Sequence, residues 1–481
     1  MSDEHLNMSQ AQARAVQELM RIAPVIDDLG GRFAAAGEQI ALVGGPVRDA
    51  MLGRAHYDLD FTTSARPEVT ERLVKGWADA VWDIGREFGT IGCRRGDYQI
   101  EITTYRSEKY DPSSRKPTVD YGDTLRGDLG RRDFTVNAMA VALPGRVFED
   151  PYGGIVDLAH KVLRTPGRPE DSFADDPLRM MRAARFAAQL GFTVAPEVRQ
   201  AMTDMAERIT IVSAERVRDE LVKLVCAPRP RAGLTLLVET GLAGYVLPEL
   251  PALALERDEH HRHKDVYEHT LTVLEQTIDL EDRLPGGGPD FTARFAALMH
   301  DIGKPRTRRF QSDGTVTFHH HDVVGAKLTR KRMQALRFSG DDVAAVATLV
   351  ELHLRFHGYG DGQWTDAAVR RYVRDAGELL PWLHVLTRAD CTTRNQRKAD
   401  RLRRTYDALE ERIARLSEQE ELASIRPDLD GNQIMEILGI PAGPQVGAAY
   451  RHLLELRLDH GPMSYDEARD ALLAWAADGL V

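Results

Sequence analysis

Cysteine is scarce in this chain of 481 residues, which contains only Cys93, Cys226 and Cys391. A disulfide framework needs cysteines in pairs and a thiolate zinc site needs them close together, so neither is expected. No run of about 18 apolar residues occurs, and the N-terminal residues lack the basic region and apolar core of a signal peptide. We therefore expect a cytoplasmic protein that has no membrane partner.

The chain also lacks an excess of positive charge, since 63 lysine and arginine residues are outnumbered by 74 acidic ones and the formal net charge is −11. Binding of nucleic acid depends on lysine and arginine, which release counterions from the phosphate backbone. Basic runs nevertheless occur at residues 304–309, 327–332 and 394–404. Local clusters matter more than the total charge, so each run is either part of a path for RNA or an ordinary solvated helix face.

The chain is too long for a single hydrophobic core, and about two to four domains are expected. Apolar runs that stop at turn formers predict strands at residues 40–43, 58–63, 80–84, 90–94, 99–105 and 138–143. Helices are predicted at 10–30, 46–52, 177–190, 214–225 and 266–284, and the pattern is helical almost throughout from about residue 175. The predicted fold class is therefore α+β, with a small mixed head that contains a sheet and all-helical parts after it.

The most informative segment is LVGGPVRDAMLGRAHYDLDFTT at residues 42–63, which reads strand, turn, helix, strand. Gly44 and Gly45 let backbone N–H groups approach a triphosphate closely, and the helix N-terminus that follows favours its negative charge. Arg48 adds a guanidinium that can bind the same phosphates. These three residues are predicted to bind a nucleotide.

Asp58 and Asp60 lie two residues apart on a predicted strand, so both carboxylates project from one face and can share hard cations. Two magnesium ions roughly 3.5–4 Å apart can activate an attacking hydroxyl and stabilise a leaving pyrophosphate. Glu101, in the strand-like segment QIEITTY, is the best candidate for a third carboxylate. We predict that Asp58, Asp60 and Glu101 are catalytic and that the two aspartates bind Mg²⁺.

This segment resembles the signature of the nucleotidyltransferase superfamily, in the branch of the class II tRNA nucleotidyltransferases and bacterial poly(A) polymerases. Further segments match that family in order: RRDFTVNAMA at 131–140, EDPYGGIVDL at 149–158, DDPLRMMRAARFAAQLGF at 175–192, SAERVRDELVKL at 213–224 and DLDGNQIMEILGIPAGPQVG at 428–447. The resemblance implies a polymerase β-like head at residues 1–160, a base-recognising neck at 161–240, an HD-type helical body at 241–410 and a tRNA-binding helical tail at 411–481.

The resemblance also implies an activity, the addition of CMP, CMP and AMP from CTP and ATP to the 3′ end of tRNA, without an obligate protein partner. Asp176 and Arg179 would pair with the incoming base, with Arg182 and Arg185 nearby. Their spacing lets Asp176 and Arg179 point to one side of a helix, whereas Asp176 and Arg185 would face nearly opposite ways. The chain departs from the family at Asp175, where a glutamate is usual.

Contacts with the triphosphate and ribose are assigned by the same resemblance to Arg132, Asp133 and Asn137, with Arg132 the first choice for phosphate. An ion pair between Arg132 and Asp133 is the structural alternative. Residues 106–122, RSEKYDPSSRKPTVDYG, resemble the family's flexible loop, which is needed when the specificity shifts from C to A. Their presence favours complete CCA synthesis over CC addition alone.

A second set of residues follows the order of the HD phosphohydrolase superfamily. Its members are His269, the pair His300 and Asp301 in LMHDIGKP, and Asp390 in TRADCTTRN, with His321 and His353 where some relatives add ligands to a second metal. Imidazole and carboxylate ligands of this kind bind divalent metals that activate water. The resemblance implies either a phosphodiesterase or phosphatase for damaged RNA 3′ ends, or a rigid body that only supports the tRNA.

The sequence leaves rival functions. A bacterial poly(A) polymerase shares every motif, although such enzymes tend to carry an extended basic tail and this chain ends in EARDALLAWAADGLV. An HD phosphohydrolase whose head merely binds RNA predicts loss of the head ligands, yet Asp58, Asp60 and Glu101 are present. A purely structural RNA-binding protein would leave both ligand sets without a purpose.

Overall fold

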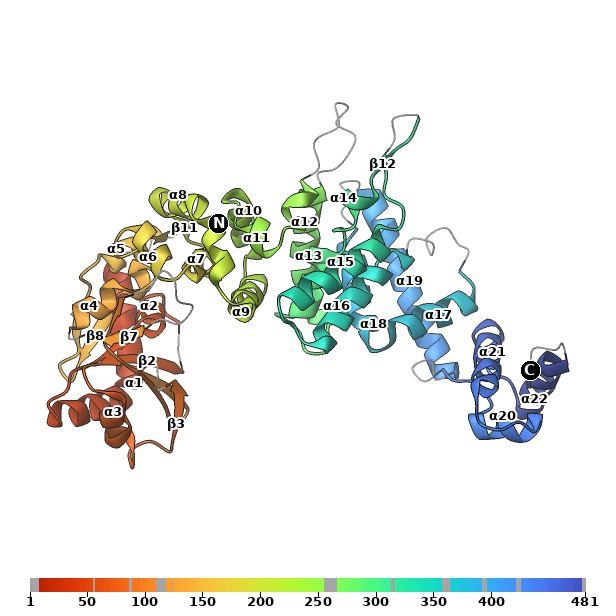
Figure 1. The fold of residues 1–481 in the computed structure, drawn as a ribbon, viewed down its shortest axis with the longest axis horizontal. Helices are drawn as coiled ribbons and strands as arrows, with labels where there is room; N and C mark the ends of the chain where they lie inside the picture. The colour runs from red at the N-terminus through yellow and green to blue at the C-terminus, as the bar shows by residue number, and fades with distance from the viewer. Residues whose placement is uncertain are drawn as a thin grey trace. The chain divides into compact units, whose positions relative to one another are not determined.

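The chain divides into two compact units, residues 1–248 and 249–481 (Figure 1). The structure is a computed structural model and describes residues 8–54, 57–85, 89–109, 118–122, 124–254, 266–312, 316–356, 364–391, 396–420 and 425–477. Within these residues no helix combines the length and apolar character needed to cross a membrane. The finer division into head, neck, body and tail stays a prediction.

The first unit contains a seven-stranded sheet in the order β3-β4-β5-β2-β1-β8-β9. Its strands are β1 Ile40–Val43, β2 Asp58–Thr63, β3 Ala80–Gly85, β4 Thr90–Arg95, β5 Tyr98–Thr104, β8 Ala140–Leu143 and β9 Val147–Glu149. The predicted α+β class and six predicted strands are confirmed within one or two residues. The short strand β9 was not predicted.

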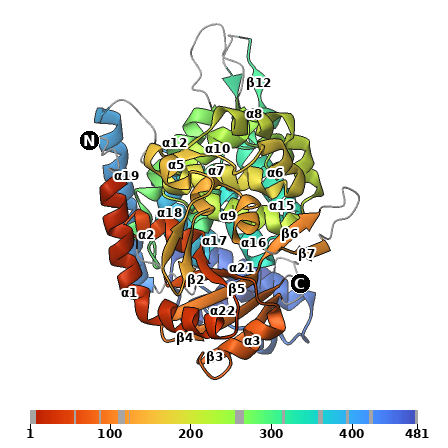
Figure 2. The ribbon, with the colours of Figure 1, turned by 90° about the vertical axis from the view of Figure 1, so that its left-hand side faces the viewer.

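Helices α1 (Met8–Ala35) and α3 (Pro67–Val74) pack on this sheet, and α2 (Gly45–Met51) connects β1 to β2 (Figure 2). Ile26, Leu29 and Phe33 of α1 are fully buried. The predicted helices at 10–30 and 46–52 are therefore confirmed, and α1 is longer than expected. Strands β6 (Arg106–Lys109) and β7 (Thr118–Tyr121) form an antiparallel pair at the two ends of the predicted flexible loop. Residues 110–117 of that loop lie outside the described residues.

The register between β2 and β5 positions the predicted carboxylates. These strands are parallel, with Asp58 opposite Gln99 and Asp60 opposite Glu101. Side chains alternate between the faces of a strand, so the three carboxylates share one face while Leu59 and its neighbours are buried on the other. The sheet thus brings together residues that lie about forty positions apart in the sequence.

Helices complete the first unit. They are α4 Leu125–Gly130, α5 Gly154–His160, α6 Pro169–Asp175, α7 Leu178–Leu190, α8 Pro196–Asp204, α9 Ala214–Val225, α10 Pro230–Glu239 and α11 Ala243–Val246. Helix α7 packs against both α9 and α10. Gly233 makes the second contact close, because a Cβ atom there would collide with the carbonyl oxygen of Ala184. The predicted helices at 177–190 and 214–225 correspond to α7 and α9.

The second unit is helical. Its helices are α12 Val266–Ile278, α13 Phe291–Met299, α14 Lys304–Thr307, α15 His321–Ala335, α16 Gly340–Leu352, α17 Asp366–Ala376, α18 Leu380–Ala389, α19 Gln396–Glu420, α20 Gly431–Leu438, α21 Pro444–His460 and α22 Tyr465–Trp475. A two-residue strand pair, β12 (Arg309–Phe310) and β13 (Val316–Thr317), lies between α14 and α15. Helices α20 to α22 enclose a small core of their own, which includes Ile434, Leu453 and Leu472.

The predicted helix at 266–284 was too long, because α12 ends at Ile278. A separate 3₁₀ turn follows at Glu281–Arg283. The carboxylate of Glu281 is buried and accepts hydrogen bonds from Arg294 and from the backbone N–H of Asp290. This tertiary pairing ends the helix where the local apolar pattern would have continued it.

Candidate functional site

The first candidate site lies on the face of the sheet that carries Asp58, Asp60 and Glu101. Strands β2 and β5 hold all three side chains exposed to solvent. Partial burial raises the pKa of Glu101, and the charges of Asp60 and Asp58 raise it further. Three carboxylates that repel one another in this way form a site that a cation would stabilise. The carboxylate oxygens of Asp58, Asp60 and Glu101 do not form a group in which all three residues lie within 4.8 Å of one another.

Gly44 brings the turn after β1 next to these carboxylates. Its φ of 73° is in the left-handed region, which favours glycine. A Cβ atom on Gly44 would lie 3.1 Å from Nη1 of Arg132 and 4.0 Å from Oδ2 of Asp60. The turn, the guanidinium and the carboxylate therefore meet at one point. The buried Nε of Arg132 has no hydrogen-bond partner among the described residues. The Arg132 side chain is 22% exposed, so a ligand such as a phosphate can reach it.

Asp128 was not among the predicted site residues, although its carboxylate contacts Arg132. Its carboxylate is fully buried and accepts hydrogen bonds from Arg131 at 2.8 Å, Arg132 at 3.3 Å and the hydroxyl of Thr62 at 3.1 Å. Burial opposes ionisation, yet the two guanidiniums hold the pKa of Asp128 below its ordinary value. The signal in the sequence was its position four residues before Arg132, on the short helix α4.

Arg48, which was predicted to bind a nucleotide, is buried in the structure. Only 4% of the residue is exposed, and its guanidinium donates to Asp49 at 3.0 and 2.9 Å and to the side-chain oxygen of Asn137 at 2.6 Å. These contacts make it a support for Asn137. A direct contact between Arg48 and a nucleotide stays a prediction. Gly45, the other predicted member of this turn, begins α2.

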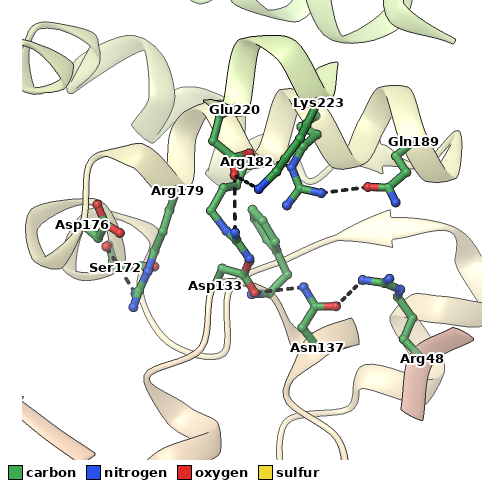
Figure 3. Close-up of polar contacts among 12 residues, drawn as sticks. Arg48, Asp133, Asn137, Ser172, Asp176, Arg179, Arg182, Gln189, Glu220 and Lys223 are labelled. Atoms are coloured by element: carbon green, nitrogen blue, oxygen red, sulfur yellow. Dashed lines mark hydrogen bonds and ion pairs between the residues drawn. The ribbon is translucent and has the colours of Figure 1, made fainter. Parts of the chain in front are cut away.

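A buried network of alternating charges joins residues 133–137, which precede β8, to helices α7 and α9 (Figure 3). Asp133 accepts two hydrogen bonds from Arg182, at 2.8 and 2.6 Å, and one from Asn137 at 3.0 Å. Glu220 of α9 lies 3.6 Å from Arg182 and accepts from Arg185 at 2.6 Å. Burial opposes the charge on Asp133, but Arg182 and Asn137 hold the pKa of its carboxyl well below the ordinary value. The pair predicted as an alternative, Arg132 with Asp133, is not formed.

Phe186 lies at the centre of this network. The guanidinium carbon of Arg185 is 4.0 Å from the ring centroid, and those of Arg48 and Arg182 are 5.3 and 5.5 Å away. A ring face attracts cations, so Phe186 holds three guanidiniums that would otherwise repel one another. Arg182 and Arg185, predicted to bind nucleotide, are thereby fixed in place before any ligand arrives.

Replacing Arg182 by glutamine should lower the free energy of unfolding by about 3 kcal/mol, because it leaves Asp133 buried without its cation. The difference in unfolding free energy between the variant and the wild type should shrink in acid. The pKa of Asp133 is lowered in the folded wild type, so this carboxylate stabilises the wild type at pH values above the ordinary carboxyl pKa, and that stabilisation is lost as the pH falls. Urea unfolding at several pH values measures both effects.

The matched control for this change is Arg199→Gln, which breaks an ion pair with Glu239 whose two side chains are 51% and 47% exposed. Exposed pairs contribute at most about 1 kcal/mol, so the control should remain close to wild type. Equal losses from the two variants would contradict the buried-pair account.

The prediction that Asp176 and Arg179 share one helix face is wrong. Asp176 is not on the helix, because α7 begins at Leu178 and Asp176 lies before it with extended backbone. Pro177 explains this boundary, since it disfavours helical backbone in the residue before it. The spacing argument that put both side chains on one helix face therefore fails.

These two side chains have defined partners in the structure. Asp176 accepts a hydrogen bond from Arg216 at 2.7 Å, a contact that was not predicted. Arg179 is 8% exposed and donates to the hydroxyl of Ser172 at 2.9 Å and to the carbonyl oxygen of Arg131 at 2.6 Å. Pairing of Asp176 and Arg179 with a base stays a prediction, and these contacts would position them for it.

The second candidate site gathers all six predicted HD residues. They form two groups in which every ligand atom lies within 4.8 Å of the others, one of His269, His300 and Asp390 and one of Asp301, His321 and His353. Asp301 connects the groups, because its carboxylate lies 3.2 Å from Nε2 of His300 and 3.3 Å from Nε2 of His321. Such a mixture of imidazoles and carboxylates suits one or two divalent transition metals.

The hydrogen bonds of three imidazoles support a metal at this place. Nδ1 of His300, His321 and His353 each lies 2.6–2.8 Å from a backbone carbonyl oxygen three residues earlier. That contact requires a proton on Nδ1 and leaves the lone pair on Nε2. All three Nε2 atoms are buried without a hydrogen-bond partner among the described residues. Three buried lone pairs that converge beside Asp301 are explained by a cation.

The charges of the cluster fit the same interpretation. Burial and the neighbouring His300 lower the pKa of His353 to about 4, so this imidazole is neutral at pH 7, the form that binds a metal. Burial opposes ionisation of Asp301, but His300 and His321 hold the pKa of its carboxyl well below the ordinary value. Lys304 also contacts this carboxylate, at 2.5 Å.

Comparison with protein families assigns three parts of the chain. Residues 40–164 match the Poly A polymerase head domain, residues 191–253 match a domain described as the probable RNA and SrmB-binding site of polymerase A, and residues 266–395 match the HD domain. The two candidate sites therefore fall in the first and the third of these matches.

Among similar proteins, an A-adding tRNA nucleotidyltransferase of Deinococcus radiodurans is 36% identical and aligns with 91% of this chain and 96% of its own. A CC-adding tRNA nucleotidyltransferase of Thermus thermophilus is 33% identical over 90% and 93%. A CCA-adding enzyme of Levilactobacillus brevis is 43% identical over 44% of this chain and 52% of its own. The fold is similar to the crystal structure of Bacillus stearothermophilus CCA-adding enzyme in complex with CTP, with a TM-score of 0.65, 24% identity and coverage of 96% and 98%.

Proposed function

Because this chain belongs to the family of bacterial tRNA nucleotidyltransferases, we propose that it builds the CCA end of tRNA by adding CMP, CMP and AMP from CTP and ATP. The observation that carries the proposal is the meeting of Gly44, Arg132 and Asp60 on the sheet face that also holds Asp58 and Glu101. This arrangement offers a phosphate contact beside a set of metal ligands.

Each part of the head has a role in this reaction. The turn at Gly44 lets backbone N–H groups approach the triphosphate, and Arg132 donates to its oxygens. Asp58 and Asp60 hold divalent metal, which we take to be Mg²⁺ and which supplies activation of the tRNA 3′ hydroxyl and stabilisation of the leaving pyrophosphate. Asp133 and Asn137 hold the neighbouring backbone and side chains in place for the nucleotide.

The selection of nucleotides can be tested with acceptors of different length. We expect purified protein to convert tRNA that lacks its end to tRNA ending in CCA when CTP and ATP are both present, and to stop after CC with CTP alone. Gel electrophoresis and sequencing of the products measure this. Hairpins and unstructured RNA serve as control acceptors.

Two other outcomes correspond to specific alternatives. The relative aligned over 91% of this chain is named for A addition, so a product that forms only from tRNA already ending in CC would assign A addition alone. The family of the head also includes poly(A) polymerases. A long A tract on any acceptor would assign that activity and overturn the CCA proposal.

For the second unit we propose a metal-dependent phosphohydrolase that acts on RNA 3′ ends bearing a phosphate ester. The two ligand groups and the three converging Nε2 atoms support metal binding there. Lys304 contacts Asp301 and adds positive charge where a phosphate would approach. We place both activities in the cytoplasm, where tRNA and nucleotides are available. We assign tRNA binding to the helical tail, residues 411–481, whose helices α20 to α22 enclose a core of their own.

A further inference from the structure

The segment between the two halves of the HD cluster carries concentrated positive charge. Residues 304–321, KPRTRRFQSDGTVTFHHH, contain four lysine or arginine residues and a single acidic residue, although the whole chain has a net charge of −11. Asp301 precedes this segment and His321 ends it. The described parts, residues 304–312 and 316–318, are called the basic hairpin below. A basic island on an acidic protein indicates a particular anionic partner.

The arginines of the basic hairpin are uncommitted. Among the described residues, Arg306, Arg308 and Arg309 form no ion pair, and the contact of Arg309 is a hydrogen bond to the carbonyl oxygen of its neighbour Arg308. Two arginines of α15, the helix that follows the hairpin, are paired instead, Arg330 with Glu351 and Arg332 with Glu249. Three guanidiniums on residues 306–309 that have no carboxylate partner among the described residues can bind phosphates without breaking an ion pair there.

An aromatic ring lies among these charges. Phe310 is 68% exposed, and no other large hydrophobic side chain among the described residues is more exposed. Its ring is held from one side, because the guanidinium carbon of Arg308 lies 4.7 Å from the ring centroid. Pairing of Phe310 with Val316 across the strands fixes the backbone beneath it. An exposed ring flanked by cations is the arrangement on which unpaired bases stack.

Both ends of the basic hairpin contact the predicted HD residues. At one end Lys304 donates to Asp301, and at the other the carbonyl oxygen of Phe318 accepts from Nδ1 of His321 at 2.8 Å. Figure 1 shows β12 extending beyond the helices of its own unit. A strand bound along the hairpin is therefore led toward the ligands of the second site.

We propose that the basic hairpin captures an unpaired RNA end for the HD site, with Arg306 and Arg309 on backbone phosphates and Phe310 under a base. The proposal rests on the proposed phosphohydrolase function for the step that follows capture. Capture itself needs no turnover and is measured separately. An unpaired end is required, because a base inside a duplex cannot reach the ring of Phe310.

The test is binding of a fluorescein-labelled single-stranded RNA of twelve nucleotides to the full-length protein, followed by fluorescence anisotropy over a series of salt concentrations. We expect Phe310→Ala to weaken binding about tenfold, as loss of one stacked base does. The double variant Arg306→Gln/Arg309→Gln should lower the salt slope by about 1.4, because each phosphate contact to a single strand contributes about 0.7. The matched control, Arg283→Gln/Arg355→Gln, removes the same charge from arginines outside the basic runs that already pair with Glu410 and Asp375.

Crosslinking identifies the place of contact, since the head also binds RNA. The same RNA carrying 4-thiouridine at its 3′ end should crosslink within residues 304–318, as mapped by mass spectrometry. Unchanged affinity and salt slope in both hairpin variants, or a preference for a duplex of the same sequence, would overturn the proposal.

Hydrolysis separates the two proposals. Wild type is given an RNA with a 2′,3′-cyclic phosphate end and the small ester bis(p-nitrophenyl) phosphate. Loss of RNA hydrolysis alone in the hairpin variants supports capture, because the small ester needs no hairpin. If the wild type hydrolyses neither ester, the phosphohydrolase function fails, while the binding experiment still decides whether the hairpin captures RNA.

Discussion

Replacing Asp60 by alanine should lower kcat for nucleotide addition by at least about 1,000-fold. The carboxylate lies at the point where Gly44, Arg132 and the face of β2 meet, so the change would remove a proposed metal ligand beside the proposed phosphate contact. Bound metals supply several kcal/mol of charge stabilisation in such reactions, and each 1.36 kcal/mol is a factor of ten in rate. Primer extension on tRNA with CTP and ATP measures the loss.

The folded state should survive this change, because Asp60 is exposed at the surface of the sheet. Asp97→Ala is the matched control, since it removes an exposed aspartate from the turn between β4 and β5 of the same sheet and should leave transfer near the wild-type rate. Hydrolysis at the second site should also be unchanged in Asp60→Ala. Transfer that persists undiminished would contradict the assignment of this site.

Replacing Asp301 by asparagine should abolish stable metal binding by the second unit. The carboxylate of Asp301 lies 3.2 Å from Nε2 of His300 and 3.3 Å from Nε2 of His321, one histidine from each ligand group, so one substitution affects the whole cluster. Asparagine keeps the size of the side chain but lacks the charge that offsets a divalent cation. Inductively coupled plasma measurement on dialysed protein compares the metal content of the variant with that of the wild type.

The control for this experiment is Asp341→Asn, which changes an exposed aspartate in the first turn of α16 and should retain the full metal content. Nucleotide addition should be normal in Asp301→Asn, because the proposed metal ligands for that reaction, Asp58 and Asp60, are in the other unit. Equal metal content in wild type and Asp301→Asn would remove the basis for a metal at the HD residues.

The strands and the HD residues could be predicted because their sequence patterns are local. The strand at Asp58–Thr63 was predictable because its alternation of polar and apolar residues follows the burial of one face. The six HD residues were found by their order and local context, and the structure brings all of them together. The partner of Asp60 across the sheet, Glu101, was likewise expected from a strand-like segment.

The rest depended on contacts between distant segments. Asp128 accepts a hydrogen bond from Arg132, but its spacing of four residues from Arg132 did not by itself predict that its carboxylate is buried. The buried pairing of Arg48 with Asn137 joins residues 89 positions apart and could not be read from spacing. The predicted placement of Asp176 on a helix was wrong for a local reason, because Pro177 follows it and the helix begins only at Leu178.

The parallel pairing of β2 with β5 has a consequence for biosynthesis. Between these strands the chain forms β3 and β4, and β4 pairs with β5 on its far side. A contact between Asp60 and Glu101 therefore closes a long loop and forms late, after the local hairpins. A ribosome that has released only the first hundred residues exposes both aspartates without the third carboxylate or Arg132. The nascent head would thus be unable to consume CTP or ATP until most of it has been synthesised.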